Sequence, residues 1–401
     1  MSRAQGATDE NGDVLALLGN GVSIAHNDTL AMHVLTRRLV ERLNEAAGLG
    51  ADSARALLNL VAANLGEEAA ENSQDDFEAL LGPFDHLAQT LTGLRDLSVY
   101  ASDAEDTLTA IEKVSQFAAR VRRLGVSHIL EAIDCASRVP MLKPSPLDAL
   151  LEALFRAGSH GLPGHLTIAS LNYDSLVPSR ITPPAADCTA RGAFDLTGER
   201  SVSMAVRGRG ADLHGRVLDI GRPTAGRHAA PTTLLQLHGS LSWLRSPDGT
   251  TARFEMKDLR GDQQMKSYWS AWRDGECDWT PAVILANQKY KSRLVEQHPF
   301  DIAYDQFTAS LLHAERWLIA GYSFRDEIVN ERLRTVFSLR GRRPQVLIVS
   351  KGADSPQSWV SETLNLREDD PATFQFVDGG LADLESTSAW RTWLDGVPGL
   401  Y

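Results

Sequence analysis

The chain has 401 residues and a formal net charge of −12, from 40 Lys and Arg against 52 Asp and Glu. This balance argues against direct nucleic-acid binding, because a phosphate-binding surface needs a local excess of basic residues. The 3 Cys (Cys135, Cys188 and Cys277) form neither the CxxC pairs of a zinc site nor an even set for disulfides. No apolar run reaches the ~18 residues of a membrane span, and residues 1–12 lack the apolar core of a signal peptide. We therefore expect a cytoplasmic protein without a structural metal.

The first apolar run, residues 14–18, predicts a parallel strand that is buried on both faces. It leads into Gly19-Asn20-Gly21-Val22-Ser23, where the glycines permit close approach of the backbone to a ligand. Apolar residues at helical spacing then predict a helix from Leu30 to about Asn44, with Asn27, Asp28 and Thr29 as candidate caps. A strand, a Gly-containing turn and a helix can bind a pyrophosphate, although a plain connecting turn fits the same residues.

Residues 45–160 are rich in Ala, Leu, Glu and Arg and poor in β-branched runs, which predicts helices. Stripes at helical spacing occur in residues 77–87 and 108–121. We interpret 45–160 as a helical insertion between the first two strands of a sheet. The predicted α/β core then comprises residues 13–44 and 161–401.

The second apolar run, residues 166–171, ends abruptly in Asn172-Tyr173-Asp174. Another run at 234–237 ends in His238-Gly239-Ser240. Between them, alternating segments such as 201–206 predict hairpins. Residues 245–280 carry Trp269, Trp272 and Trp279, which we expect to pack in a core or contact a partner rather than to stack on a base.

Four further strands are predicted at 282–286, 317–320, 346–349 and 374–377. Helices are predicted from Tyr304 toward Trp317 and from a cap at Asp326 to about Leu339. The run at 317–320 ends in Gly321-Tyr322-Ser323-Phe324, and the run at 346–349 ends in Ser350. Roughly seven strands separated by helical segments predict an α/β, Rossmann-like, doubly wound and mostly parallel sheet. Ligands bind such sheets at the carboxyl ends of the strands.

In this order the motifs resemble those of the sirtuin-like family of NAD-consuming proteins. Residues 19–23 are similar to its phosphate-binding Gly-x-Gly-x-Ser motif, and 172–174 to its Asn-x-Asp motif. His238-Gly239 is similar to its His-Gly motif, and 321–324 to its Gly-Thr-Ser segment. The family's deacylases also carry a four-Cys zinc module, whereas only Cys277 follows His238 here.

The chain is closer to the bacterial branch that hydrolyses NAD in anti-phage defence, which it resembles in the helical insertion, the Leu-His-Gly-Ser motif and the Gly-Tyr-Ser-Phe-x-Asp segment. The resemblance implies an NAD+ hydrolase that yields nicotinamide and ADP-ribose in abortive infection. A module that senses NAD or ADP-ribose without turnover remains the alternative, and a protein deacylase is disfavoured.

The resemblance also assigns roles to residues. Asn172 would bind the ribose and a water, His238 would act as general base, and Asp174 would contact the nicotinamide amide. NAD is the implied substrate, and no metal is implied. The residues expected to hold NAD are Gly19, Asn20, Gly21, Ser23, Gly239, Gly321, Tyr322, Ser323 and Ser350.

An ungated NAD hydrolase would drain its own cell, so we expect a homo-oligomer that is regulated by a separately encoded defence partner. Related defence proteins work beside a HerA-type ATPase or a short Argonaute, and the acidic charge leaves nucleic-acid contact to such a partner. The helical insertion and the Trp269, Trp272 and Trp279 region are the predicted assembly surfaces, because aromatic residues are enriched in interface cores.

Overall fold

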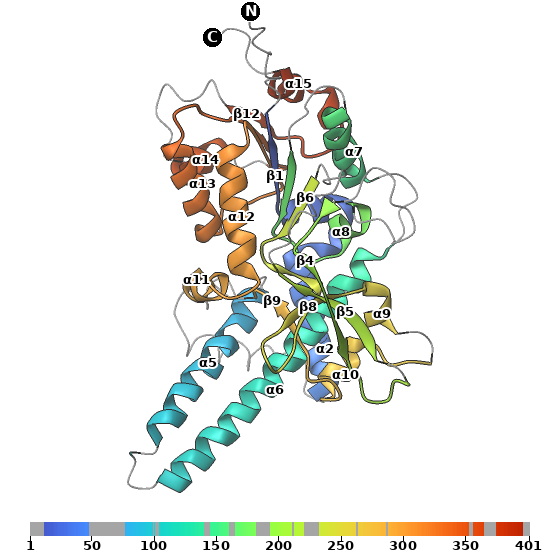
Figure 1. The fold of residues 1–401 in the computed structure, drawn as a ribbon, viewed down its shortest axis with the longest axis vertical. Helices are drawn as coiled ribbons and strands as arrows, with labels where there is room; N and C mark the ends of the chain where they lie inside the picture. The colour runs from blue at the N-terminus through green and yellow to red at the C-terminus, as the bar shows by residue number, and fades with distance from the viewer. Residues whose placement is uncertain are drawn as a thin grey trace, which may run out of the picture.

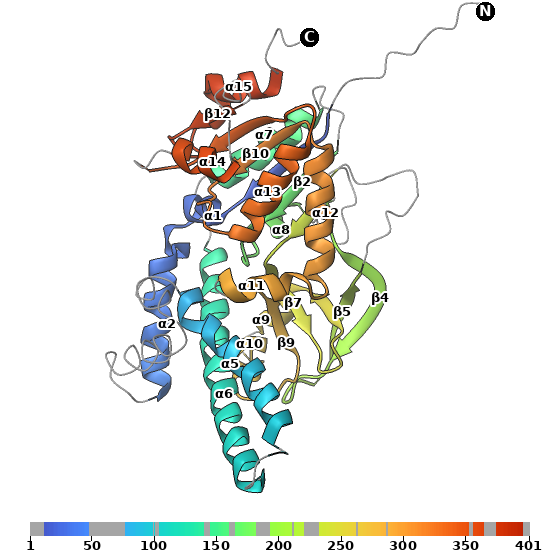
Figure 2. The same cartoon turned by 90° about the vertical axis from the view of Figure 1, so that its left-hand side faces the viewer.

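The computed structural model describes residues 12–47, 77–98, 100, 104–139, 145–159, 165–181, 193–210, 212–219, 232–261, 264–285, 288–352, 356–364 and 374–395. These residues form an α/β fold built on two sheets (Figures 1 and 2). The larger sheet has seven strands in the order β12-β11-β10-β1-β2-β6-β3, and all its pairings are parallel. Its strands in chain order are β1 (Val14–Leu18), β2 (Leu166–Ser170), β3 (Ala193–Phe194), β6 (Thr232–Gln236), β10 (Arg316–Ala320), β11 (Gln345–Val349) and β12 (Phe374–Val377).

The central strands are mostly apolar, and β1 is so at every position, because helices cover both faces of the parallel sheet. In β1, Ala16 and Leu18 point into one hydrophobic core, whereas Leu15 and Leu17 point into the other. Helices α12 (Phe300–His313) and α13 (Glu327–Leu339) pack in the second core. The first core holds residues of α2 (Met32–Ala47), α6 (Ala104–Ser137), α7 (Pro146–Ser159) and α15 (Ser388–Asp395). The prediction of a doubly wound Rossmann-like sheet is therefore confirmed.

The smaller sheet has five antiparallel strands in the order β4-β5-β8-β7-β9. They are β4 (Thr197–Met204), β5 (Leu213–Leu218), β7 (Gly239–Arg245), β8 (Thr251–Phe254) and β9 (Thr280–Val283). The predicted hairpin near 201–206 is present as β4 and β5. The prediction that 282–286 continues the parallel sheet is wrong, because this segment contributes β9, which pairs antiparallel with β7. Its apolar run resembled a parallel strand because it too is buried.

Two predicted helices differ from the structure. The chain enters helix α1 (Asn20–His26) directly after Gly19, passes through a 3-10 turn (Asp28–Leu30) and then forms α2. The helix predicted from Leu30 corresponds to α2, which begins at Met32, and α1 was not predicted. The predicted helix running toward Trp317 ends at His313, because Trp317 already lies in β10. The remaining helices are α5 (Phe77–Ser98), α8 (Leu176–Ile181), α9 (Met256–Arg260), α10 (Tyr268–Arg273), α11 (Gln288–Val295) and α14 (Pro356–Leu364).

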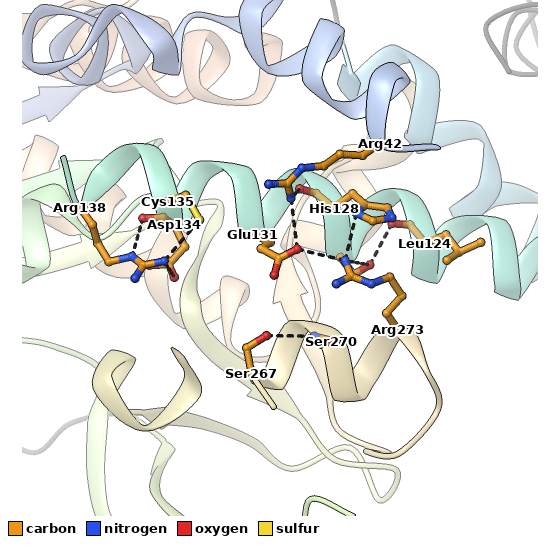
Figure 3. A network of polar contacts seen from close by, with 11 residues as sticks. Arg42, Leu124, His128, Glu131, Asp134, Cys135, Arg138, Ser267, Ser270 and Arg273 are labelled. Atoms are coloured by element: carbon orange, nitrogen blue, oxygen red, sulfur yellow. Dashed lines mark hydrogen bonds and ion pairs between the residues drawn. The ribbon is translucent and has the colours of Figure 1, made fainter. Parts of the chain in front are cut away.

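Helices α5 and α6 form a long hairpin that projects from the body of the molecule (Figures 1 and 2). The predicted boundary of the helical insertion, between residues 44 and 45, lies inside α2. At the base of the hairpin, Glu131 on α6 lies 3.1 Å from Arg42 of α2 and 3.1 Å from Arg273 of α10 (Figure 3). One carboxylate between two guanidinium groups thus ties the insertion to the segment between β8 and β9 of the smaller sheet.

The tryptophan cluster belongs to the core of the chain. Trp269 and Trp272 are 1% and 3% exposed, and both pack against Tyr268. Trp279 is partly buried and meets Phe254 edge-on, with ring centroids 5.2 Å apart. The packing interpretation of this cluster is therefore correct, and neither Trp269 nor Trp272 presents a side chain to a partner.

Candidate active site at the carboxyl edge of the parallel sheet

The strand order places the predicted motifs side by side. Strands β10, β1, β2 and β6 are consecutive in the sheet, and the chain leaves β1 to one side and returns on the other. A ligand site is expected at such a switch point, beyond the carboxyl ends of the strands. The register is level along this edge: Leu18 pairs with Ala320 and Ser170, and Ser170 pairs with Gln236. Asn172 and His238 each follow two residues after a paired position, on strands about 4.8 Å apart.

Asn172 is held by a directional hydrogen-bond chain. Its amide nitrogen donates to the Gly19 carbonyl at 3.1 Å and to the Ser23 hydroxyl at 2.8 Å. Because a carbonyl only accepts, this contact fixes which end of the amide is nitrogen. The Ser23 hydroxyl donates onward to Asp174 Oδ2 at 2.5 Å. The amide oxygen of Asn172 has no hydrogen-bond partner among the described residues, so it is available to a ribose hydroxyl or a water.

Asp174 is 4% exposed, and its contacts are made within the protein. Its Oδ1 accepts from the Leu176 backbone at 2.9 Å, and its Oδ2 accepts from Ser23. Burial raises the pKa of Asp174, while the hydrogen bonds from Ser23 and Leu176 and the charge of Arg180 act in the opposite direction. The observed contacts of Asp174 orient Ser23 and the start of α8. The role of Asp174 at the nicotinamide amide therefore stays a prediction.

The glycines of the first and last motifs allow two backbone segments to touch. A Cβ on Gly19 would lie 2.5 Å from the Gly321 carbonyl oxygen, and a Cβ on Gly21 would lie 2.7 Å from Gly321 Cα. Gly321 itself has φ +60°, and an added Cβ there would lie 2.5 Å from Val22 N. The Gly19 and Gly21 N–H groups donate to the carbonyls of Ala320 and Gly321, each at 2.9 Å. In this structure those two N–H groups are therefore engaged within the fold and do not point at a phosphate.

His238 lies where the chain passes from the parallel sheet to the smaller sheet. It follows β6, and Gly239, with φ +83°, starts β7. The His238 carbonyl accepts from Ile284 at 3.0 Å, and its Nε2 lies 2.9 Å from Asp326 Oδ2. Asp326 also receives the ammonium of Lys291 at 2.6 Å. His238, Asp326 and Lys291 are all buried and form one polar cluster.

The environment of His238 combines opposing influences on its pKa. Burial and the Lys291 charge lower the pKa of His238, whereas Asp326 and a hydrogen bond to the backbone at Leu171 raise it. The direction that results is downward, so the ring is neutral near pH 7 and can accept a proton. Hydrogen bonding to His238 and the charge of Lys291 hold the pKa of Asp326 well below its usual range, despite its burial.

The remaining predicted NAD-binding residues are Asn20, Tyr322, Ser323 and Ser350. Asn20 lies at the first position of α1, where its side chain donates to the Leu30 carbonyl at 3.4 Å, and Ser323 is exposed. Tyr322 is buried, and its hydroxyl bonds to Asn330 and to the Asp326 carbonyl, which directs it toward α13. Ser350 follows β11, one strand beyond β10, and its backbone pairs with Val377 and Gly380.

Two residues of the polar cluster lay outside the predicted site. Asp326 was expected only as a helix cap, and it does cap α13 by accepting from the N–H groups of Ile328 and Val329. The one indication in the sequence that Asp326 belongs to the site was its position two residues after Phe324, in the Gly-Tyr-Ser-Phe-x-Asp segment. Lys291 gave no signal, because a lysine on a short helix is ordinarily solvated.

A family model described as "SIR2-like domain" matches residues 167–368, half of the chain. The match spans Asn172, His238 and Asp326. The chain belongs to the SIR2-like family. No curated protein matches the sequence. Membership of the SIR2-like family is compatible with NAD-dependent activity. The site residues of this chain lie at the carboxyl edge of its parallel sheet.

Two further properties bear on the SIR2-like domain. Within the described ranges, no three or more His, Cys, Asp or Glu side chains gather in a way that could hold a metal ion. Among the helices that the structure describes, none is long and apolar enough to cross a membrane.

Proposed function

We propose that this SIR2-like protein is an NAD+ glycohydrolase, which cleaves the bond between nicotinamide and ribose and releases nicotinamide and ADP-ribose. The observation that carries the proposal is the level placement of Asn172 and His238 on adjacent strand ends, beside the switch point of the sheet. An amide with a free oxygen and a buried, neutral imidazole are suited to binding ribose hydroxyls and accepting a proton.

The reaction builds positive charge on the ribose as nicotinamide leaves, and a water then attacks the same carbon. Asn172 is held by Gly19 and Ser23, so its amide oxygen can orient a ribose hydroxyl or the water without reorganising. His238 can take the proton that the water or hydroxyl loses, since burial and Lys291 keep the ring neutral. Ser23 connects Asn172 to Asp174 and thereby fixes both side chains.

Two other functions compete with hydrolysis. A sensor that binds NAD or ADP-ribose without turnover would not require a buried histidine paired with a carboxylate, and this pair favours an enzyme. Protein deacylation is disfavoured by the sequence, where Cys277 is the single cysteine after His238.

We also propose that the enzyme acts in anti-phage defence as a homo-oligomer with a separately encoded partner, a HerA-type ATPase or a short Argonaute. The hairpin of α5 and α6 supports assembly, because it carries exposed apolar side chains: Leu94, Leu97, Tyr100, Val114 and Phe117. Exposed apolar groups gathered on one projecting element are typical of contact surfaces.

The deciding experiment measures nicotinamide release from NAD+ by the purified protein, alone and with candidate partners. We expect His238→Ala and Asn172→Ala to lower the rate by about 10²-fold or more, the range for loss of a general base. His214→Ala, on the exposed face of β5, is the matched control and should leave the rate unchanged. Wild-type rates in both site variants would contradict the assignment of the site, and binding of NAD without any release of nicotinamide would favour the sensor.

A further inference from the structure

The buried cluster of His238, Asp326 and Lys291 joins three separate parts of the chain. His238 follows β6, Asp326 precedes α13, and Lys291 lies on α11. Side-chain exposures are 8%, 8% and 5% in that order, so water screens these charges little. A buried carboxylate with two cationic or hydrogen-bonding partners persists only when each partner is well placed.

The geometry determines where the protons lie. An ionised carboxylate only accepts hydrogen bonds, and Asp326 Oδ2 lies 2.9 Å from His238 Nε2 and 2.6 Å from Lys291 Nζ. The backbone at Leu171 is a second acceptor for the ring, and the charged carboxylate is the stronger of the two, so the neutral imidazole carries its proton on Nε2 and its lone pair on Nδ1. Asp326 Oδ1 is engaged separately by the N–H groups of Ile328 and Val329 at 3.2 and 3.4 Å, and this contact fixes the orientation of the carboxylate.

We propose that Asp326 is a positioning residue that holds His238 as its Nε2–H tautomer, and that Lys291 keeps Asp326 in the ionised, hydrogen-bonding state. This inference rests on the proposed function, because the tautomer matters to catalysis only if His238 accepts a proton from substrate or water. Asp326 touches neither substrate nor water in this scheme and acts through His238. The same logic governs triads in which an acid holds a histidine in one tautomer.

Lys291 and Asp326 also influence the pKa of His238, and this pKa determines the acid limb of the activity, the range of low pH over which kcat falls. The charged groups that face His238 are Lys291 from α11, which lowers its pKa, and Asp326 from the start of α13, which raises it. Tyr173 packs beside the ring, with centroids 6.1 Å apart. Removing Lys291 should therefore raise the pKa of His238, and removing the charge of Asp326 should lower it.

The test uses Asp326→Asn and Lys291→Met, with Glu327→Gln as the matched control. Glu327 is the next residue on the same helix, its side chain is 62% exposed, and its substitution removes the same charge without touching His238. In Asp326→Asn the amide oxygen is needed by the cap N–H groups, because the amide nitrogen cannot accept. The amide nitrogen then faces His238 Nε2 and forces the proton to Nδ1.

We expect ¹⁵N-histidine spectra of the full chain to show His238 protonated on Nε2 in the wild type and Glu327→Gln, and on Nδ1 in Asp326→Asn. The His238 signal is identified as the one absent from His238→Gln. The rate of NAD hydrolysis should fall by about 10²-fold or more in Asp326→Asn, toward the ~10⁴-fold loss seen when a triad histidine adopts the wrong tautomer. The acid limb of kcat should move to lower pH in Asp326→Asn and to higher pH in Lys291→Met.

An unchanged tautomer in Asp326→Asn, or acid limbs that coincide with that of Glu327→Gln, would overturn the inference. If Asp326→Asn does not fold, the Lys291→Met profile decides, and the absence of an upward shift counts against it. A protein that hydrolyses no NAD yet changes tautomer in Asp326→Asn would contradict the proposed function while supporting the positioning role of Asp326.

Discussion

The side-chain amide of Asn172 donates a 2.8 Å hydrogen bond to the hydroxyl of Ser23, 149 residues earlier in the chain. This bond joins the residue that follows β2 to the first turns of α1, which follows β1. It also connects Asn172 to Asp174, because the same hydroxyl donates to the Asp174 carboxylate. The orientation of Asn172 therefore depends on a hydroxyl supplied by the neighbouring strand connection.

Ser23→Ala tests this dependence. The substitution removes one of two acceptors from the Asn172 amide nitrogen and the only side-chain donor that the structure pairs with Asp174 among its described residues. We expect kcat for NAD hydrolysis to fall by about tenfold, which corresponds to ~1.4 kcal/mol and is typical of one lost hydrogen bond. Ser203→Ala on β4, where the side chain is exposed, is the control. Equal kcat values for Ser23→Ala and Ser203→Ala would show that Ser23 does not position Asn172.

Gly239→Ala should destabilise the fold at the junction of the two sheets. Gly239 has φ +83°, and an added Cβ would lie 2.1 Å from the Ala282 carbonyl oxygen. We expect the free energy of unfolding to fall by about 2–4 kcal/mol from strain and overlap together. Gly249→Ala is a sharp control, because it has φ +88° with open space around it and should lose only about 1 kcal/mol. Similar losses in urea denaturation would mean that close packing on Ala282 is unimportant.

From the lowered pKa of His128, at the base of the α5–α6 hairpin, we predict that the fold loses stability in acid. Burial, followed by the charges of Arg273 and Arg42, lowers the pKa of His128 to about 4, while Glu131 acts in the opposite direction (Figure 3). His128 thus binds a proton less readily in the folded state than in the unfolded state, where its pKa is near ~6.5. The stabilisation is complete above about pH 6.5 and is lost as the pH falls toward 4.

We expect this loss to amount to about 1–3 kcal/mol and to be smaller in His128→Gln, which carries no titrating ring. The measurement is urea denaturation at pH values between 4 and 7. His214→Gln replaces an exposed histidine and should keep the pH dependence of the wild type. Parallel stability profiles for the wild type and His128→Gln would refute this prediction.

The exposed apolar side chains of the hairpin lead us to predict that charged substitutions there weaken self-association. Leu97 and Phe117 are 62% and 53% exposed, on α5 and α6 respectively. If copies of the chain associate through this surface, Leu97→Glu with Phe117→Glu should reduce the mass in solution measured by light scattering at micromolar concentration. Leu339→Glu, at a site 72% exposed at the end of α13, should not. A wild-type chain that is strictly monomeric and fully active without a partner would disprove the proposed oligomeric gating.

The sequence predicted the parallel sheet well, for a physical reason. Strands buried on both faces are apolar at every position, so runs such as 14–18 and 346–349 stand out from their surroundings. The runs at 166–171 and 234–237 end abruptly where the chain meets the sheet edge, which singled out Asn172 and His238. The segment at 282–286 shows the limit of this reasoning, because an apolar run does not reveal which sheet it joins.

The sequence by itself determined which residues stand at the ends of buried strands, since that information is local in the chain. Only the tertiary structure decided what those residues touch. The pairing of His238 with Asp326 spans 88 residues, and that of Lys291 with Asp326 spans 35 and joins two different helices. Hydrophobic periodicity reports which side of an element is buried, and it carries no record of the polar partner met there. Strand order, the turn at Gly239 and the burial of Lys291 bring that cluster together, and each depends on packing across the whole fold.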